Sequence, residues 1–257
     1  MFAMGVATLD RREGDPAVLD EPARPTRTGR LVLRTVRHGA EAITLPQRRV
    51  RVEPDVYVVA DGLQTFAWPV ESDTRPLVVE IAIPDGLDPT GLDFLQTLRS
   101  IDGEVGQRLL AIGDSDPGAG RVVASDDASA LLWSALATEE RRLRARAERI
   151  DCTKPSTRQA LFRRLLLSAD FIHSNYAEPL RVEALAEVSN LSPFHFARLF
   201  GLVMDATPHA FLVKKRVAVA RRLLAAGVPR HEVAERAGFG CRSTLFRHLR
   251  TPASVPS

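Results

Sequence analysis

The stretch VEALAEVSNLSPFHFARLF, residues 182–200, decides the fold of the C-terminal part of the chain. Its first half repeats apolar side chains at three- and four-residue spacing, which predicts a short helix, and the small Ala186 allows two helices to cross closely. Asn190 follows, and Asn tolerates the left-handed backbone of a tight turn. Ser192 and Pro193 then predict the N-cap and the first residue of a second helix.

The second helix has one face for the core and one for solvent. Phe196, Leu199 and Phe200 are spaced by three and four residues and form the expected buried face. The side chains left pointing outward are Phe194, His195, Ala197 and Arg198.

A related pattern recurs about fifty residues later as VAERAGFGCRSTLFRHL, residues 233–249. Gly238 takes the left-handed turn position, and Leu245 and Leu249 anchor the helix that follows. The outward residues of that helix are Arg242, Ser243, Phe246 and Arg247. Two such units in order favour a protein that reads the DNA major groove with paired helix-turn-helix motifs.

A capped helix is expected between the two units. Thr207 and Pro208 predict its start, and Gly227 predicts its end. A helix of roughly 16 to 18 residues is about 25 Å long, comparable with the ~34 Å between successive major-groove faces. Lys214 and Lys215 lie on it, and we expect them to contact DNA phosphates.

The two units and their connector resemble the DNA-binding domain of the AraC/XylS family of bacterial transcription regulators, over roughly residues 166–250. The resemblance implies that each second helix enters a major groove, with His195 at a phosphate or in packing. The DNA-binding residues that it implies, together with the two lysines, are Ser192, Phe194, His195, Ala197, Arg198, Arg242, Ser243, Phe246 and Arg247.

Three positions depart from the family pattern. Asp205 stands where a Gly is usual, Gly201 replaces a usual Lys, and residues 251–257 with two prolines stand where the family forms a final short helix. We therefore expect the second unit to be less well supported than the first. An alternative is a degenerate regulator, or a small-molecule-binding protein, that no longer binds DNA productively.

Charge separates the two halves of the chain. Residues 155–257 contain 15 Lys and Arg against 7 Asp and Glu, a net charge of +8, whereas residues 1–154 contain 20 against 25, a net charge of −5. The C-terminal half therefore has the charge expected of a polyanion-binding domain, although a solvated helix face would also account for single arginines.

The sequence predicts an α+β protein in four parts: a flexible arm (1–28), a β-rich cupin-like effector or sensor domain (29–86), a helical linker or dimerisation region (87–155) and an all-α DNA-binding domain (156–257). Between residues 31 and 84, β-branched runs alternate with turn residues, and Asp61-Gly62 predicts a hairpin. The cupin-like domain is expected from its place in the family architecture. Leu92, Leu95 and Leu98 predict a helix in the linker, and residues 139–149 predict either a solvated or a dimerising helix.

Tyr57, Phe66 and Trp68 are candidates for an apolar effector pocket, and ordinary core packing is the alternative. We expect no bound metal and no cofactor, because His38 is the single His before residue 173 and a metal needs several such ligands. Cys152 and Cys241 are expected to be free thiols, in a reducing compartment.

The function predicted from the sequence is sequence-specific regulation of transcription, controlled by an unidentified small-molecule effector. The expected partners are double-stranded promoter or operator DNA, RNA polymerase and a second copy of the chain in a homodimer. An enzyme is disfavoured because no nucleophile with its base, carboxylate pair or metal set is apparent. No signal peptide or membrane-spanning stretch is expected, and the protein should be cytoplasmic and associated with the nucleoid.

Overall fold

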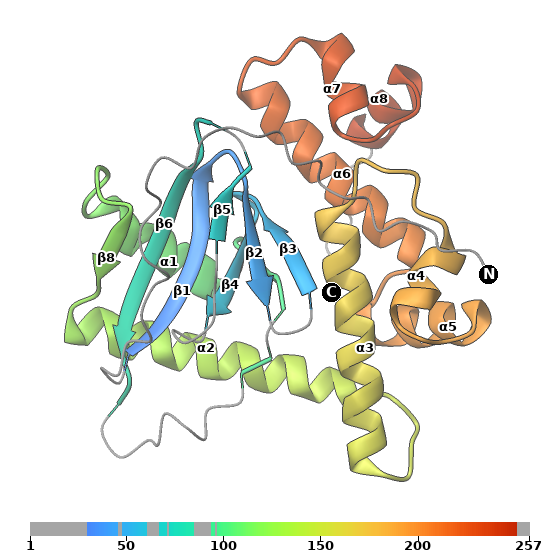
Figure 1. Cartoon of the computed structure of the whole chain (residues 1–257), viewed down its shortest axis with the longest axis horizontal. Helices are drawn as coiled ribbons and strands as arrows, with labels where there is room; N and C mark the ends of the chain where they lie inside the picture. The colour runs from blue at the N-terminus through green and yellow to red at the C-terminus, as the bar shows by residue number, and fades with distance from the viewer. Residues whose placement is uncertain are drawn as a thin grey trace.

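A computed structural model describes residues 30–45, 48–60, 67–70, 72–84, 94–95 and 97–250, without the side chains of Ala60 and Trp68. Strands fill its N-terminal part and helices its C-terminal part, so the fold is α+β as predicted (Figure 1). The arm expected at residues 1–28 and the turn at Asp61-Gly62 lie outside the described residues.

Strands form in the region predicted to be β-rich, and two short ones follow it. They are β1 (Arg30–His38), β2 (Glu41–Leu45), β3 (Arg48–Val52), β4 (Val56–Ala60), β5 (Ala67–Pro69), β6 (Arg75–Ala82), β7 (Arg99–Ser100) and β8 (Arg121–Val123). Among the described residues they make a five-stranded sheet in the order β7-β4-β1-β6-β8 and a three-stranded sheet in the order β3-β2-β5. All pairs are antiparallel except β6 with β8.

Strand β4 lies between two apolar layers, because successive side chains of a strand point to opposite faces. Val56 and Val58 pack with the small sheet, while Tyr57 and Val59 join the core on the other face of the large sheet. The hydroxyl of Tyr57 donates a hydrogen bond to Oε1 of Glu139 at 2.7 Å, so its polar end is satisfied inside the protein.

Two helices cover that second face: α1 (Glu104–Asp114) and α2 (Asp126–Ala147). Leu109 from α1 and Leu132 and Leu136 from α2 are fully buried against the sheet. Part of the segment expected as a helical linker therefore packs on the β-rich part and adds β7 and β8 to its sheet. The boundaries at 28, 86 and 155 stay predictions.

The sequence predicts a helix through Leu92, Leu95 and Leu98. For Leu95 and Leu98, which the structure describes, this prediction is wrong. Leu95 and Leu98 lie in irregular backbone that leads into β7, and both are buried. Their side chains belong to different apolar clusters. The spacing of three residues therefore reflects the burial of each leucine in a different apolar cluster. It does not mark one buried face of a helix.

The C-terminal part consists of helices packed around one apolar core. They are α3 (Pro155–Ser174), α4 (Val182–Val188), α5 (Pro193–Met204), α6 (Pro208–Ala225), α7 (Arg230–Arg236) and α8 (Arg242–Arg250). Helix α3 stands between the small sheet and the other helices, and α6 runs from the region of α5 to that of α7 and α8 (Figure 1).

Candidate nucleic-acid interface

The first helix-turn-helix unit is built from α4, a four-residue turn and α5. Asn190 takes the left-handed conformation, with φ of 51°. Its N–H bonds to the oxygen of Glu187 at 2.9 Å, and the N–H of Leu191 bonds to the oxygen of Ala186 at 3.0 Å. This pair of bonds is a Schellman motif, which satisfies the last carbonyls of α4 and turns the chain sharply.

Helix α5 starts and ends as the sequence predicts. The side chain of Ser192 accepts a hydrogen bond from the N–H of His195 at 3.4 Å, and Pro193 is the first helical residue. Asp205 caps the other end in the left-handed conformation, with φ of 54°. The interior face consists of Phe196, Leu199, Phe200 and Val203, all at most 2% exposed.

The opposite face of α5 is open to solvent. Phe194 is 82% exposed, which is unusual for so large an apolar side chain, and Arg198 lies one turn further along. His195 is exposed and Ala197 is half-buried. Leu202, a further turn on, is 42% exposed. The four outward residues predicted for this helix are therefore on its accessible side.

The second unit repeats the turn geometry of the first. Gly238 has φ of 77°, its N–H bonds to the oxygen of Glu235 at 2.9 Å, and the N–H of Phe239 bonds to the oxygen of Ala234 at 2.7 Å. A Cβ at Gly238 would lie 2.7 Å from Cα of Ala177, so the turn also needs a residue without a side chain.

Helix α8 presents Arg242, Ser243 and Arg247 to solvent, as predicted. Phe246 is half-buried, because the guanidinium of Arg230 lies 5.7 Å from the centre of its ring. Leu245 is the buried anchor of the helix. A single buried residue in α8, against four in α5, gives the second unit less apolar support than the first within the described residues.

An exposed thiol lies at the start of α8. Sγ of Cys241 is 3.1 Å from the hydroxyls of both Ser243 and Thr244, and these hydrogen bonds lower the pKa of the thiol to about 7. Both cysteines are free, as expected, and Cys152 is half-buried.

Helix α6 joins the units over 18 residues, as predicted, with Thr207 as N-cap and a left-handed Gly227 behind its end. Lys214 is exposed and available to a phosphate. Lys215 is not, because its side chain is 2% exposed and its ammonium contacts Glu53 and Asp55. The phosphate contact predicted for Lys215 is therefore wrong for this conformation.

The comparisons with known proteins address this C-terminal part. Residues 185–254 match the family described as "Helix-turn-helix domain". The solved structure titled "Crystal structure of the DNA-binding domain of AdpA, the global transcriptional factor, in complex with a target DNA" is 30% identical, and the alignment covers 35% of this chain and 82% of that one, with a TM-score of 0.34. The chain belongs to the AraC/XylS family.

Two structures of ToxT from Vibrio cholerae align over more of this AraC/XylS chain, at low identity. ToxT from strain O395 is 8% identical, with coverage of 86% and 84% and a TM-score of 0.36. A second crystal form is 10% identical, with coverage of 88% and 86% and a TM-score of 0.35. The comparison with curated proteins gives no match.

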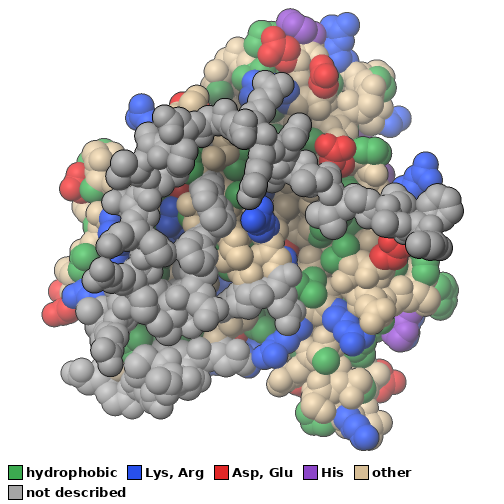
Figure 2. All heavy atoms as spheres, in the orientation of Figure 1, with side chains coloured by type: hydrophobic (Ala, Val, Ile, Leu, Met, Phe, Trp, Pro, Cys, Tyr) green, Lys and Arg blue, Asp and Glu red, His purple; other side chains and the backbone are tan. Residues whose placement is uncertain are grey.

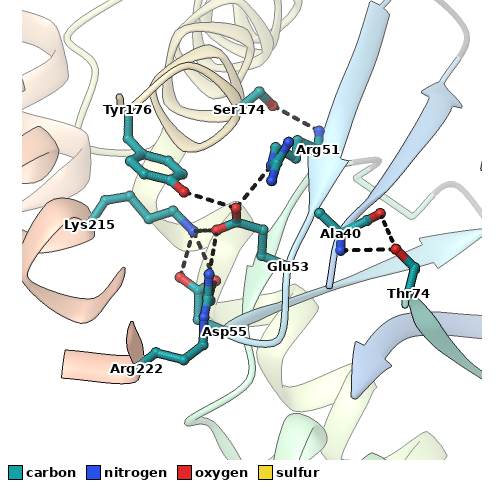
Figure 3. Close-up of polar contacts among 9 residues, drawn as sticks. All are labelled: Ala40, Arg51, Glu53, Asp55, Thr74, Ser174, Tyr176, Lys215 and Arg222. Atoms are coloured by element: carbon teal, nitrogen blue, oxygen red, sulfur yellow. Dashed lines mark hydrogen bonds and ion pairs between the residues drawn. The ribbon is translucent and has the colours of Figure 1, made fainter. Parts of the chain in front are cut away.

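The N-terminal part of this AraC/XylS chain reaches α6 through its acidic corner, which we define as Glu53, Pro54 and Asp55 between β3 and β4 (Figure 3). The N–H of Val56 bonds to the oxygen of Glu53 at 3.0 Å, which makes the corner a tight turn with Pro at its second position. Burial alone would raise the pKa of Glu53, but Lys215, Arg222 and Arg51 outweigh it and lower the pKa to about 2.

Sequence reasoning missed the acidic corner and its partner Arg222. The available signal was Lys215 itself, which shares the buried helical phase of Leu212, Val219 and Ala220. A charged residue in such a phase requires a buried counter-charge. The sequence could not identify that counter-charge, because it lies 162 residues away.

The effector pocket predicted from three aromatic residues is not formed at Tyr57. That side chain is fully buried in the core, and burial together with Glu139 raises the pKa of its hydroxyl. Phe66 lies outside the described residues, and only the backbone of Trp68 is described, paired with Ala42.

The described residues contain no group of three His, Cys, Asp or Glu that could bind a metal ion. In the same part of the chain no single helix is long and apolar enough to cross a bilayer, although α5 and α6 together, bent by 55°, meet the length and composition required. Figure 2 shows that the helical part presents both signs of charge on the face in view.

Proposed function

We propose that the chain binds operator DNA in a sequence-specific manner, with α5 and α8 in successive major grooves. The observation that carries this proposal is the outer face of α5, where Phe194 is 82% exposed beside Arg198 while the inner face is fully packed. Arg pairs with the O6 and N7 atoms of guanine, and Phe contacts the methyl group of thymine. These two residues are therefore suited to read adjacent base pairs.

The remaining residues have supporting roles in the proposal. Arg242, Ser243, Phe246 and Arg247 read bases from α8, and Lys214 binds phosphate. Ser192 and His195 lie at the start of α5, where backbone N–H groups and the helix dipole favour a phosphate. Because α8 has less apolar support, we expect α5 to contribute more of the discrimination between sequences.

The N-terminal part is proposed to be the regulatory part of the molecule, with a small-molecule effector, and the chain to act as a homodimer that works with RNA polymerase. Leu131 on α2 is 55% exposed. It lies on the same helix as the start of the charged segment 139–149, which the sequence predicts to be either solvated or dimerising. We propose the same four parts of the chain as the sequence predicts, except that the β-rich part also includes α1, α2 and the short strands β7 and β8.

The test uses labelled duplexes that tile the DNA upstream of the chain's own coding region, with a scrambled duplex of equal composition. We expect the chain to prefer one duplex, and Arg198→Ala to weaken that binding by about 1–3 kcal/mol. Arg75→Ala is the matched control, because Arg75 is an exposed arginine at the start of β6, away from the proposed DNA-binding and dimerisation segments. Equal affinity for all duplexes, or equal effects of the two variants, would contradict the proposal.

A further inference from the structure

The strongest unexplained feature of the molecule is the ion cluster between the acidic corner and α6 (Figure 3). Nζ of Lys215 lies 3.1 Å from Oε2 of Glu53, and 2.8 Å and 2.7 Å from the two carboxylate oxygens of Asp55. The corner therefore surrounds the ammonium with carboxylate oxygens and removes it from water.

A second cation of α6 binds the same corner. Arg222 is seven residues after Lys215, which is two helical turns along the same face. Its Nη1 lies 3.1 Å from Oδ1 of Asp55, and its Nη2 lies 3.1 Å from Oε2 of Glu53. The two contacts attach the corner to two positions along one face of α6.

The corner also binds the other side of the joint between the two units. The hydroxyl of Tyr176, in the loop between α3 and α4, donates to Oε1 of Glu53 at 3.0 Å. The neighbouring β3 adds a hydrogen bond from the N–H of Arg51 to Oγ of Ser174, at 3.0 Å. Glu53 thus connects the approach to the first unit with the helix that leads to the second.

A further polar attachment lies lower on α3. The carboxylate of Asp170, which is 1% exposed, accepts hydrogen bonds from Oγ1 of Thr97 at 2.8 Å and from the N–H of Leu98 at 2.9 Å. Arg48 of β3 pairs with the same carboxylate. Charged and hydrogen-bonded groups thus form a substantial part of the contact between the N-terminal part and the helices, beside apolar packing such as that of Leu95 in the helical core.

Polar contacts between parts of a chain can separate in water at lower cost than apolar ones, because both surfaces are rehydrated. A half-open ion cluster is unfavourable, since it leaves charges buried without partners. The cluster therefore favours two discrete states, closed and open, as a switching contact requires.

The closed state restricts what the DNA-binding part can do. With 18 residues, α6 is about 27 Å long, while successive major-groove faces are ~34 Å apart, and from this difference we infer an adjustment at the joint when both units bind. The corner binds both sides of that joint and opposes the adjustment. It also neutralises two cations on the helix that connects the two units.

We propose that the acidic corner is an autoinhibitory clamp, whose release from Lys215 and Arg222 allows the two helix-turn-helix units to fit DNA together. The clamp is supplied by the chain itself and needs no bound molecule to close it. This inference rests on the proposed DNA-binding function.

The first test compares two double variants of the full chain for binding to the preferred duplex by fluorescence anisotropy at one salt concentration. Glu53→Gln with Asp55→Asn removes the charges of the clamp. Asp114→Asn with Asp116→Asn removes the same charge from the exposed end of α1 and the loop behind it, and controls for general electrostatics. We expect the clamp variant to bind at least about fivefold more tightly than the control, in the usual range of coupling between sites.

Equal affinity of the two double variants, or weaker binding by the clamp variant, would overturn the inference. Wild-type chain that does not distinguish the preferred duplex from the scrambled one would instead overturn the proposed function, so the two failures are separable. Circular dichroism establishes whether the clamp variant folds.

A second measurement needs no substitution. Hydrogen exchange of the wild-type chain is followed with and without the preferred duplex. We expect the amides of Arg51 and Leu98, whose acceptors Ser174 and Asp170 lie on α3 in the closed state, to exchange faster in the complex. Unchanged or slower exchange at both positions would show that the clamp stays closed on DNA and would overturn the inference.

Discussion

Arg149, two residues beyond the end of α2, donates a hydrogen bond from its guanidinium to the main-chain oxygen of Leu202 at 3.2 Å and forms an ion pair with Asp205. Leu202 is in the last turn of α5, and Asp205 is its C-cap. The helix that supports the large sheet therefore also contacts the end of the helix proposed to read DNA.

Arg149→Ala should loosen the end of α5 without unfolding the chain. Both side chains of the ion pair are about half exposed, at 44% and 52%, so the cost in stability should stay below about 1 kcal/mol. Amide exchange at residues 202–206 should become faster. Arg141→Ala, on the exposed side of α2, is the control, and identical exchange in both variants would count against this role.

Lys214→Ala and Lys215→Ala should have different effects although the residues are neighbours. Lys214 is exposed, so its loss should reduce the dependence of log K on log salt by roughly one unit and leave stability unchanged. Lys215 is buried between two carboxylates, so its loss should cost roughly 3 kcal/mol of stability. Salt titrations of binding and denaturant unfolding measure the two effects, and a lower salt slope for both variants would place both lysines at phosphates.

Stability should fall in acid because of Glu53. Its pKa in the folded chain is about 2, below the ordinary value of 4.5, so the charged form is favoured by folding. That contribution is complete above pH 4.5, is lost as the pH falls towards 2, and amounts to about 3 kcal/mol. Unfolding free energies measured between pH 6 and 2 should decline less steeply for Glu53→Gln than for wild type. Parallel curves would mean that Glu53 titrates normally.

Gly238→Ala should destabilise the second unit by more than the 1–2 kcal/mol of left-handed strain alone, since the new Cβ would also contact Cα of Ala177 at 2.7 Å. Gly240→Ala, two residues later, should be nearly neutral, because no heavy atom lies within 4 Å of a Cβ there. Thermal unfolding of the two variants makes the comparison. A neutral Gly238→Ala would require the loop at Ala177 to move freely.

Cys241 should react with iodoacetamide with an apparent pKa of about 7, and faster than the half-buried Cys152. The adduct would lie at the start of α8, so it should weaken DNA binding. Mass spectrometry of alkylation against pH, with Cys241→Ser as the control, tests both statements. DNA affinity that is unaffected by complete alkylation would remove the start of α8 from the interface.

Local signals were sufficient for the helix-turn-helix units. Ser192 and Thr207 cap helices because each hydroxyl accepts a hydrogen bond from an N–H three residues ahead, and Asn190 and Gly238 form left-handed turns from their own backbone preferences. Each of these features depends on a few adjacent residues, so the sequence reveals it.

Features that depend on distant residues were not predictable in the same way. Lys215 was predicted to contact DNA phosphates. That prediction failed because its partners on the acidic corner come from a distant part of the chain. Leu95 and Leu98 have helical spacing, yet neither lies in a helix and they pack into separate clusters. Apolar character in the sequence indicates which residues are buried. Which residues they pack against depends on the tertiary structure.

The fixed length of α6 has a consequence for the DNA that the chain can use. A continuous helix of 18 residues has no internal hinge, so once the two units have fitted DNA it holds them at one separation and at one rotation about the duplex axis. Each base pair inserted between the two contacted segments turns the second groove by about 35°, and five insertions place it on the opposite side of the duplex. Single base changes within a segment would weaken binding gradually, whereas a shift of helical phase would leave one unit facing the wrong groove.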